Sequence, residues 1–547
     1  MPELVEWVLN GQRVKSPAGT TILEACREHG VEIPHFCYHP GLSIAGNCRM
    51  CLVETNRSPK PVISCSERIV PDLEVQTESE MAVEARNGVM EFELINHPLD
   101  CPVCDKAGEC VLQDYSFDHG PDRSRFNDNK NIRHTKRLGP TIEIWGNRCI
   151  VCTRCVRFCD EISGTGELCV VERGDRSVVD VFPDIPIDNA LAGNTIDICP
   201  VGALIGSDFK FEARVWFMDR TESVCAGCAR GCNIEVQSLD GYLKRLVPRE
   251  NREVNDWWMC DGGRYNWRYA HSDDRVRQAE SAGAIVGVNE AHNAAADLVR
   301  AAREGNRRIG LLVDPFLTCE EAFLAKELVG DGASIGGWLP EQGEGAKFPG
   351  GFTISEEKAP NRTGVEAVLG REVFGTDASA LQKALGAGDI DLLLVFAGFP
   401  DPPKDAAWTG AISKAKERIA FALFPGAWSA GADVVIPAAS PFEKEGTYAN
   451  EDGRLQRVRA SVKPGGSMPG TTSAQGEPTG VLTDHHELSA LQEIGVTAGQ
   501  RSRTLSAAGV FRQLAETTEP FSGLTHRDLP REGAVLPGFA RAAIGGA

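Results

Sequence analysis

Nineteen cysteines dominate this 547-residue sequence, and 18 of them lie within residues 1–260. A dense disulfide scaffold is typical of small secreted chains, whereas the cytosol keeps thiols reduced. The first residues show no basic segment followed by an apolar one, so we expect no secretion signal. Because reduced thiols cluster chiefly to bind metal, the cysteines predict several metal or iron–sulfur sites in the first half.

Composition and charge narrow the class of protein. Hydrophobic residues make up 42% of the chain and charged residues 24%, which is typical of folded proteins. The formal net charge of −20 does not suit general nucleic-acid binding. No run of 18 apolar residues occurs, so we expect no transmembrane helix and a cytoplasmic address. At roughly 150 residues per domain, the length predicts three or four domains.

The first cysteine set has the spacing C-x10-C-x2-C-x13-C. It consists of Cys37, Cys48, Cys51 and Cys65. A loop with Gly41 and Gly46 lies between the first two, and such a loop presents backbone N–H groups to cluster sulfurs. A four-cysteine zinc site usually shows two Cys-x-x-Cys pairs, and only one occurs here. The spacing therefore favours a [2Fe–2S] cluster over zinc.

The second set combines a histidine with three cysteines in the spacing H-x3-C-x2-C-x5-C. It consists of His97, Cys101, Cys104 and Cys110. Three thiolates within ten residues need a fourth ligand, and His97 follows a predicted amphipathic helix over residues 81–96. Two alternatives remain open on spacing alone: Cys159 closes the site in place of His97, or the site holds zinc.

The third set joins a C-x2-C-x2-C run to a distant Cys-Pro. It consists of Cys149, Cys152, Cys155 and Cys199. Bacterial ferredoxins continue this run with C-x3-C-P, but here Cys159 is followed by Asp160, and Cys199-Pro200 supplies the Cys-Pro. We therefore expect one [4Fe–4S] cluster on this set. Cys159 and Cys169 are then left over and are expected to be structural.

The fourth set has the spacing C-x2-C-x3-C-x27-C. It consists of Cys225, Cys228, Cys232 and Cys260. Four thiolates again suit one [4Fe–4S] cluster. Cys26 and Cys319 stand alone on helical patterns, and we expect both to be structural. No phosphate-binding glycine loop and no Ser/His/Asp arrangement is recognisable, so the sequence predicts no catalytic residue.

Beyond residue 275 short apolar runs alternate with alanine-rich segments, which predicts α/β structure with a mainly parallel sheet. The expected strands are 308–313, 392–396, 419–423 and 434–436, and the expected helices are 289–303, 320–328 and 378–385. Residues 463–482 are rich in Gly, Pro, Ser and Thr and predict a linker. We expect the last 60 residues to be a loosely attached tail with one helix near 504–516.

Four segments resemble the large iron–sulfur subunit (the G subunit) of bacterial NADH:quinone oxidoreductase, which is respiratory complex I. They are PHFCYHP at 34–40, GNCRMCLVE at 46–54, HPLDCPVC at 97–104 and CIVCTRCVRF at 149–158. The resemblance is dense over residues 1–275. It implies that all four sets are cluster ligands, with His97 as the histidine of the second cluster. The implied cofactors are one [2Fe–2S] and three [4Fe–4S] clusters.

The same resemblance implies an electron relay. In this family, electrons from NADH enter through a flavin on a neighbouring subunit and leave through the histidine-ligated cluster toward quinone, while the whole complex translocates protons. The implied partners are the flavin subunit and the iron–sulfur subunits leading to quinone. The implied location is the cytoplasmic face of the cell membrane, peripheral through the complex, with no nucleic acid bound.

The later part resembles a shortened molybdopterin oxidoreductase fold, on residues 316–322, 432–438 and 443–450. Such enzymes usually carry a lysine soon after the last ligand, but Cys260 is followed by Asp-Gly-Gly-Arg, so we expect no molybdopterin. The alternatives are a molybdenum-dependent formate dehydrogenase-type subunit, the diaphorase subunit of an NAD-reducing hydrogenase, and a zinc-stabilised scaffold.

The expected fold class is multidomain α+β and α/β: ferredoxin-like iron–sulfur domains, then the shortened α/β domain. The expected domains are 1–80 ([2Fe–2S]), 81–120 (histidine plus three cysteines), 138–216 (four-cysteine [4Fe–4S]), 218–274 ([4Fe–4S] of the Mo/W bis-MGD type), 275–462 (molybdopterin-oxidoreductase-like) and 463–547 (linker and tail).

Overall fold

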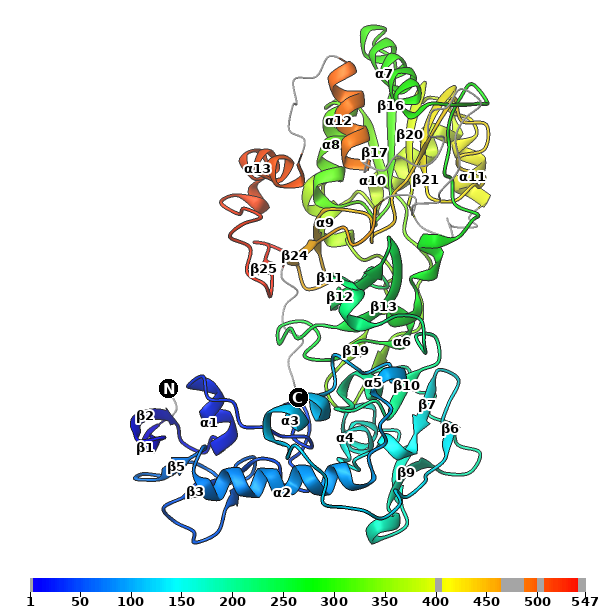
Figure 1. Ribbon diagram of the computed structural model, residues 1–547. Coiled ribbons are helices and arrows are strands. Elements are labelled where there is room, and N and C mark those ends of the chain that lie inside the picture. The colour runs from blue at the N-terminus through cyan, green and yellow to red at the C-terminus, as the bar shows by residue number, and fades with distance from the viewer. Residues whose placement is uncertain (1–2, 399–405, 464–486, 499–505, 540–547) are drawn as a thin grey trace. The chain divides into compact units, whose positions relative to one another are not determined.

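The computed structural model describes residues 3–398, 406–463, 487–498 and 506–539 (Figure 1). The chain divides into an N-terminal unit, residues 1–218 with 348–352, and a C-terminal unit, residues 219–347 with 353–547. Within the described ranges, no helix is both long and apolar enough to cross a membrane.

The N-terminal unit begins with a five-stranded sheet in the order β2-β1-β5-β3-β4. Its elements are β1 (Leu4–Leu9), β2 (Gln12–Pro17), α1 (Ile22–Glu28), β3 (Leu52–Thr55), β4 (Val62–Ile63) and β5 (Glu74–Gln76). Asn10 and Gly11 turn the first hairpin with φ of 50° and 82°, as a tight type I′ turn requires. Thr21 and Glu24 form a capping box that starts α1.

Helix α2 (Glu80–Asn96) connects this sheet module to the next cysteine-rich segment and lies along β3 (Figure 1). His97 is its C-cap, and Pro98 follows, so the helix ends where the sequence predicts. The rest of the unit is built from α3 (Val111–His119), β6 (Thr135–Arg137), β7 (Ile142–Trp145), α4 (Arg154–Arg157), β8 (Leu168–Val171), β9 (Val178–Val181), α5 (Asn194–Ile198) and β10 (Leu204–Gly206). Strands β10, β7 and β6 form one small sheet, and β8 and β9 pair as a hairpin.

The C-terminal unit opens with an antiparallel sheet in the order β11-β12-β13. Its elements are β11 (Asp219–Val224), β12 (Asn233–Leu239), β13 (Tyr242–Pro248) and the short helix α6 (Asp261–Tyr265). Two smaller sheets follow later in the chain: β18 (Ala346–Lys347) with β19 (Thr353–Ile354), and β23 (Gly446–Ala449) with β24 (Arg454–Val458) and β25 (Ala534–Val535).

A seven-stranded sheet in the order β15-β14-β22-β21-β20-β16-β17 forms the centre of this unit. The strands are β14 (Ala279–Ser281), β15 (Ala284–Val286), β16 (Ile309–Val313), β17 (Ser334–Gly337), β20 (Leu392–Ala397), β21 (Glu417–Ala422) and β22 (Val434–Pro437). The five strands from β22 to β17 are parallel, and β16 and β20 are buried along their whole length. Such burial explains their continuous apolar sequences. The predicted α/β fold with a mainly parallel sheet is confirmed.

The helices of this unit are α7 (Val288–Glu304), α8 (Cys319–Val329), α9 (Arg362–Leu369), α10 (Thr376–Gly386), α11 (Ala406–Ile412), α12 (Glu487–Thr497) and α13 (Ala507–Thr517). The predicted linker lies almost wholly outside the described residues. The expectation of a loosely attached tail is wrong for the described segments. Ile494 of α12 and Phe511 of α13 are fully buried in the main core, and β25 adds a strand to β24. The described segments of the tail are therefore part of the folded unit.

Candidate metal centres

The first set comes from two segments: Cys37, Cys48 and Cys51 lie between α1 and β3, and Cys65 follows β4. Cys37, Cys51 and Cys65 are buried, and the backbone N–H of Cys37 donates to Cys48 Sγ at 3.5 Å. The sulfurs pair further: hydrogen bonds from Cys48 to Cys37 and from Cys65 to Cys51 lower the pKa of each acceptor and raise the pKa of each donor. These segments therefore collect four sulfurs in one place and favour the thiolate at one member of each pair.

The second set lies between α2 and α3. Cys104 and Cys110 are buried while Cys101 is exposed. Cys110 is the N-cap of α3, so the free N–H groups of that helix face its sulfur, although burial raises its pKa to about 11. Burial, with a smaller contribution from Arg148, lowers the pKa of His97 to about 4. Its imidazole is therefore neutral, which is the form that binds metal.

The third set surrounds a single cavity. All four cysteines line it, together with six aliphatic residues: Ile144, Ile150, Val179, Val201, Ala203 and Leu204. The backbone N–H of Val151 donates to Cys149 Sγ at 3.4 Å, and both Val151 and Thr153 have left-handed backbones with φ of 52° and 62°. Strain of this kind is typical of functional loops.

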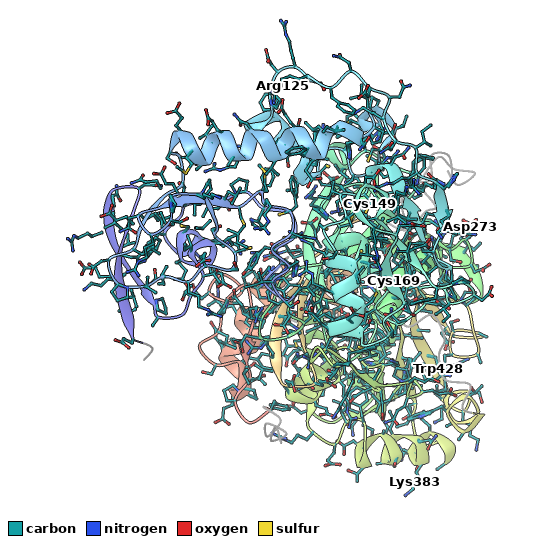
Figure 2. The ribbon with its side chains drawn as sticks, turned by 90° about the horizontal axis from the view of Figure 1, so that it is seen from below. Arg125, Cys149, Cys169, Asp273, Lys383 and Trp428 are labelled. Atoms are coloured by element: carbon teal, nitrogen blue, oxygen red, sulfur yellow. The ribbon has the colours of Figure 1, made fainter. Side chains whose placement is uncertain are left out.

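The leftover cysteines of this region lie elsewhere. Cys159 is buried next to Ser163 and does not line the cavity. Cys169 lies on β8, where its Sγ contacts the carbonyl oxygen of Asp180 at 3.6 Å. Figure 2 shows Cys169 and Cys149 at separate positions. That these two residues are structural stays a prediction.

The fourth set is built on the β11–β12 connection and the start of α6. Cys225 follows β11, and Cys232 precedes β12 and accepts a hydrogen bond from the N–H of Cys225 at 2.8 Å. The N–H of Gly227 donates to Cys225 Sγ at 3.4 Å, and that of Gly263 donates to Cys260 Sγ at 3.3 Å. A Cβ on Gly263 would lie 2.9 Å from Cys225 Sγ. Two sulfurs therefore receive backbone hydrogen bonds, and the glycine leaves room for them.

These four sets fit iron–sulfur clusters. Burial raises the pKa of Cys149 to about 11 and of Cys152 to about 12, so these thiols need a nearby positive charge, such as that of iron, to ionise. In the described part of the chain, no three His, Cys, Asp or Glu side chains converge on a position for one metal ion.

The third set lies between the first and the second in the N-terminal unit. On one side, Asn47 Nδ2 donates to the carbonyl of Val151 at 3.2 Å, and Arg157 Nη2 donates to the carbonyl of Cys37 at 2.6 Å. On the other side, the N–H of Val111 donates to the carbonyl of Pro200 at 3.1 Å. Gly202 is packed directly against Cys104. The third set is therefore linked directly to both the first and the second.

Three arginines at these junctions were missed by the sequence reasoning. Arg154 and Arg157 each donate to a backbone carbonyl next to or within the first set, and Arg148 lies beside the second. Their only signal in the sequence is their position immediately before, among or just after the cysteines at 149–155. Nothing in spacing indicates which carbonyl or carboxylate each guanidinium meets.

A parallel sheet also has a switch point, where ligands commonly bind. The parallel strand order 2-1-3-4-5 places it between β16 and β20. Asp314, directly after β16, accepts hydrogen bonds there from the N–H groups of Phe316 at 2.8 Å, Leu317 at 3.1 Å and Gly398 at 2.6 Å. The chain's own carboxylate therefore takes the backbone donors at this position.

Comparison with known families defines an iron–sulfur protein with a molybdopterin-oxidoreductase-type domain. The matches are a 2Fe-2S iron-sulfur cluster binding domain (residues 3–80), an NADH-ubiquinone oxidoreductase-G iron-sulfur binding region (86–125), an NADH-quinone oxidoreductase subunit 3 ferredoxin-like domain (139–205), an NDSU1/NuoG-like 4Fe-4S domain (218–268) and a molybdopterin oxidoreductase domain (373–468). Ferredoxin-like domains followed by this domain are the expected fold class.

Individual relatives point to one component of complex I. The G subunit of NADH-quinone oxidoreductase from Rickettsia bellii is 39% identical over 59% of this chain and 48% of its own length. The potato NADH dehydrogenase [ubiquinone] iron-sulfur protein 1 is 45% identical over 51% of this chain and 38% of its own length. Over these matched residues, the chain is a relative of the G subunit of NADH-quinone oxidoreductase, as its motifs predict. It spans about half or less of these relatives' length.

A solved chain titled as an NAD+-reducing [NiFe]-hydrogenase is also similar. It is 32% identical, and the alignment covers 39% of this chain and 91% of that one. Its TM-score of 0.36 is too low to establish a shared overall arrangement.

Proposed function

We propose that this chain is an electron-relaying iron–sulfur subunit of an NADH:quinone oxidoreductase. It would receive electrons from the NADH-oxidising flavin subunit and pass them toward quinone, in a complex that translocates protons. The observation that carries the proposal is that the third cysteine set is linked by hydrogen bonds to both the first and the second. Side chains and backbone link each set to the next within one compact unit.

The proposed ligands are the four sets. The first would hold a [2Fe–2S] cluster, and the second (with His97), the third and the fourth would each hold a [4Fe–4S] cluster. When bound, these groups supply one-electron sites. The chain's own residues hold the sulfurs, donate N–H groups to them and exclude water with an aliphatic wall at the third set. We place the chain with other complex I subunits, peripheral at the cytoplasmic face of the cell membrane.

We further propose that the seven-stranded domain is a scaffold without a molybdopterin. Asp314 takes the backbone donors at the switch point, and the fourth set lacks a following lysine. The fourth cluster stands in the other unit from the first three, and we assign it no place on the route.

Elemental analysis of the anaerobically purified chain tests these proposals. Iron, acid-labile sulfide, zinc and molybdenum are measured together, and electron paramagnetic resonance (EPR) spectra are recorded after reduction. One two-iron and three four-iron clusters predict about 14 iron atoms per chain. Zinc in place of iron would overturn the relay, and about one molybdenum per chain would make the C-terminal domain an active site.

A further inference from the structure

Arg148 is a buried cation at the junction of the second and third sets. Its side chain is 1% exposed, and its guanidinium forms an ion pair with Asp100 at 3.0 Å, one residue before Cys101. The guanidinium carbon lies 4.0 Å from the centroid of the Trp145 ring, and Nη1 donates to the carbonyl of Gly202 at 3.4 Å. These contacts fix the cation in one position.

The contacts of Arg148 place its charge beside the second set. Its Nη1 donates to the carbonyl of Gly202, and Gly202 is packed against both Cys104 Sγ and the Arg148 side chain. Asp100, its counter-ion, directly precedes Cys101. The cation therefore lies close to Cys104, and the counter-ion lies next to Cys101.

We propose that Arg148 tunes the reduction potential of the second cluster and so sets the driving force for the step from the third set to the second. In that step one electron leaves the third cluster, which is oxidised by one, and enters the second, which is reduced by one; no bond forms or breaks. The reduced second cluster carries one more negative charge, and a fixed cation nearby stabilises it. Burial strengthens the effect because little water screens the charge. This inference rests on the proposed function, since it requires a cluster on the second set.

Asp100 provides a second test, in which the reduction potential should shift in the opposite direction. Replacing Arg148 with glutamine removes the cation, so reduction of the second cluster becomes less favourable. Replacing Asp100 with asparagine leaves Arg148 without its counter-charge, so reduction becomes more favourable. Both variants break the same ion pair. If that ion pair had only a structural role, the reduction potential of the second cluster would shift in the same direction in both variants.

The experiment is an EPR-monitored redox titration of the full chain, in wild type, R148Q, R148K and D100N, with iron content measured on each sample. For R148Q we expect the reduction equilibrium constant of the second cluster to fall by roughly tenfold, about 59 mV for a one-electron couple. We expect D100N to raise this equilibrium constant by a smaller factor, because Asp100 is 35% exposed and water screens its charge. R148K keeps the positive charge, so the potential of its second cluster should lie between those of R148Q and wild type. In each variant, the reduction potential of the third cluster should shift less than that of the second.

The outcomes separate the two proposals. A wild-type chain without a second-cluster signal would overturn the proposed function. A wild-type signal with unchanged potentials in R148Q and D100N, or with both shifted the same way, would overturn the role of Arg148. If R148Q loses the cluster, D100N decides, since only an electrostatic role predicts that its potential rises above wild type.

Discussion

Two adjacent glycines at the fourth set offer a matched test of that site. Gly263 has no room for a side chain, since an added Cβ would lie 2.9 Å from Cys225 Sγ and 3.5 Å from Cys260 Sγ. Gly262, its neighbour in α6, has no heavy atom within 4 Å of an added Cβ. Neither has a left-handed backbone, so G263A and G262A differ in space rather than in backbone strain.

The magnitude follows from the overlap. An ordinary contact needs at least 3.4 Å, so in G263A the Cys225 sulfur and the new methyl group must separate by about half an ångström. Overpacking of this kind costs about 1–3 kcal/mol. A bare thiol could rotate away at little cost, but a sulfur bonded to iron and hydrogen-bonded by Gly227 cannot. The cost therefore falls on cluster binding.

The assay is iron content and EPR on G263A and G262A, purified anaerobically in parallel. We expect G263A to lose up to about four iron atoms per chain, or to release them faster to a chelator, while G262A matches wild type. Circular dichroism checks that both chains fold. Full and equally stable loading of G263A would refute the assignment of Cys225 and Cys260 to one centre.

Four further predictions concern the N-terminal unit. G202A should displace Cys104, because its added methyl group would overlap Cys104 Sγ, and should remove the second cluster. G88A, where an added Cβ has no heavy atom within 4 Å, should leave every cluster intact, and iron analysis and EPR test both variants. H97C should keep a cluster but lower its potential, because a negative thiolate replaces a neutral imidazole, and an unchanged redox titration would mean that His97 is not a ligand. C159S should leave every cluster signal intact, and loss of one would contradict the third set. Burial raises the pKa of Glu93, which lies near Cys37, to about 7; its ionisation adds negative charge, so the potentials of the first and third clusters should fall as pH rises through 7, and E93Q should abolish this slope.

Local chemistry made parts of the fold predictable. The Asn10-Gly11 turn, the Thr21 cap and the end of α2 before Pro98 depend on residues within a few positions of one another. The predicted parallel strands also formed, because strands buried on both faces require continuous apolar runs. In each case the sequence signal and the structural cause lie in the same short segment.

Long-range packing was not predictable in the same way. Helix α12 follows a stretch rich in glycine and proline, and nothing nearby in the sequence shows that Ile494 is buried in the main core. His526 bonds to Glu320 at 2.7 Å across 206 positions, which ties the tail to α8. At the cluster sites, spacing identified the cysteines but not the arginines, because a partner such as Asp100 for Arg148 is chosen only by the folded backbone.

The switch point of the seven-stranded sheet supports the proposal that this domain acts as a scaffold. An open α/β sheet leaves backbone N–H groups unpaired at the carboxyl ends of its central strands, and a bound ligand commonly satisfies them. Here Asp314 satisfies three of them, and the carboxylate is buried beside Lys444, which pairs with Glu321 at 3.2 Å. A buried carboxylate with three donors and a nearby cation does not need a ligand to be stable. The polar groups that would otherwise select for a cofactor are thus satisfied within the chain, and this supports a division of labour in which the cysteine sets carry the electrons and the sheet carries the structure.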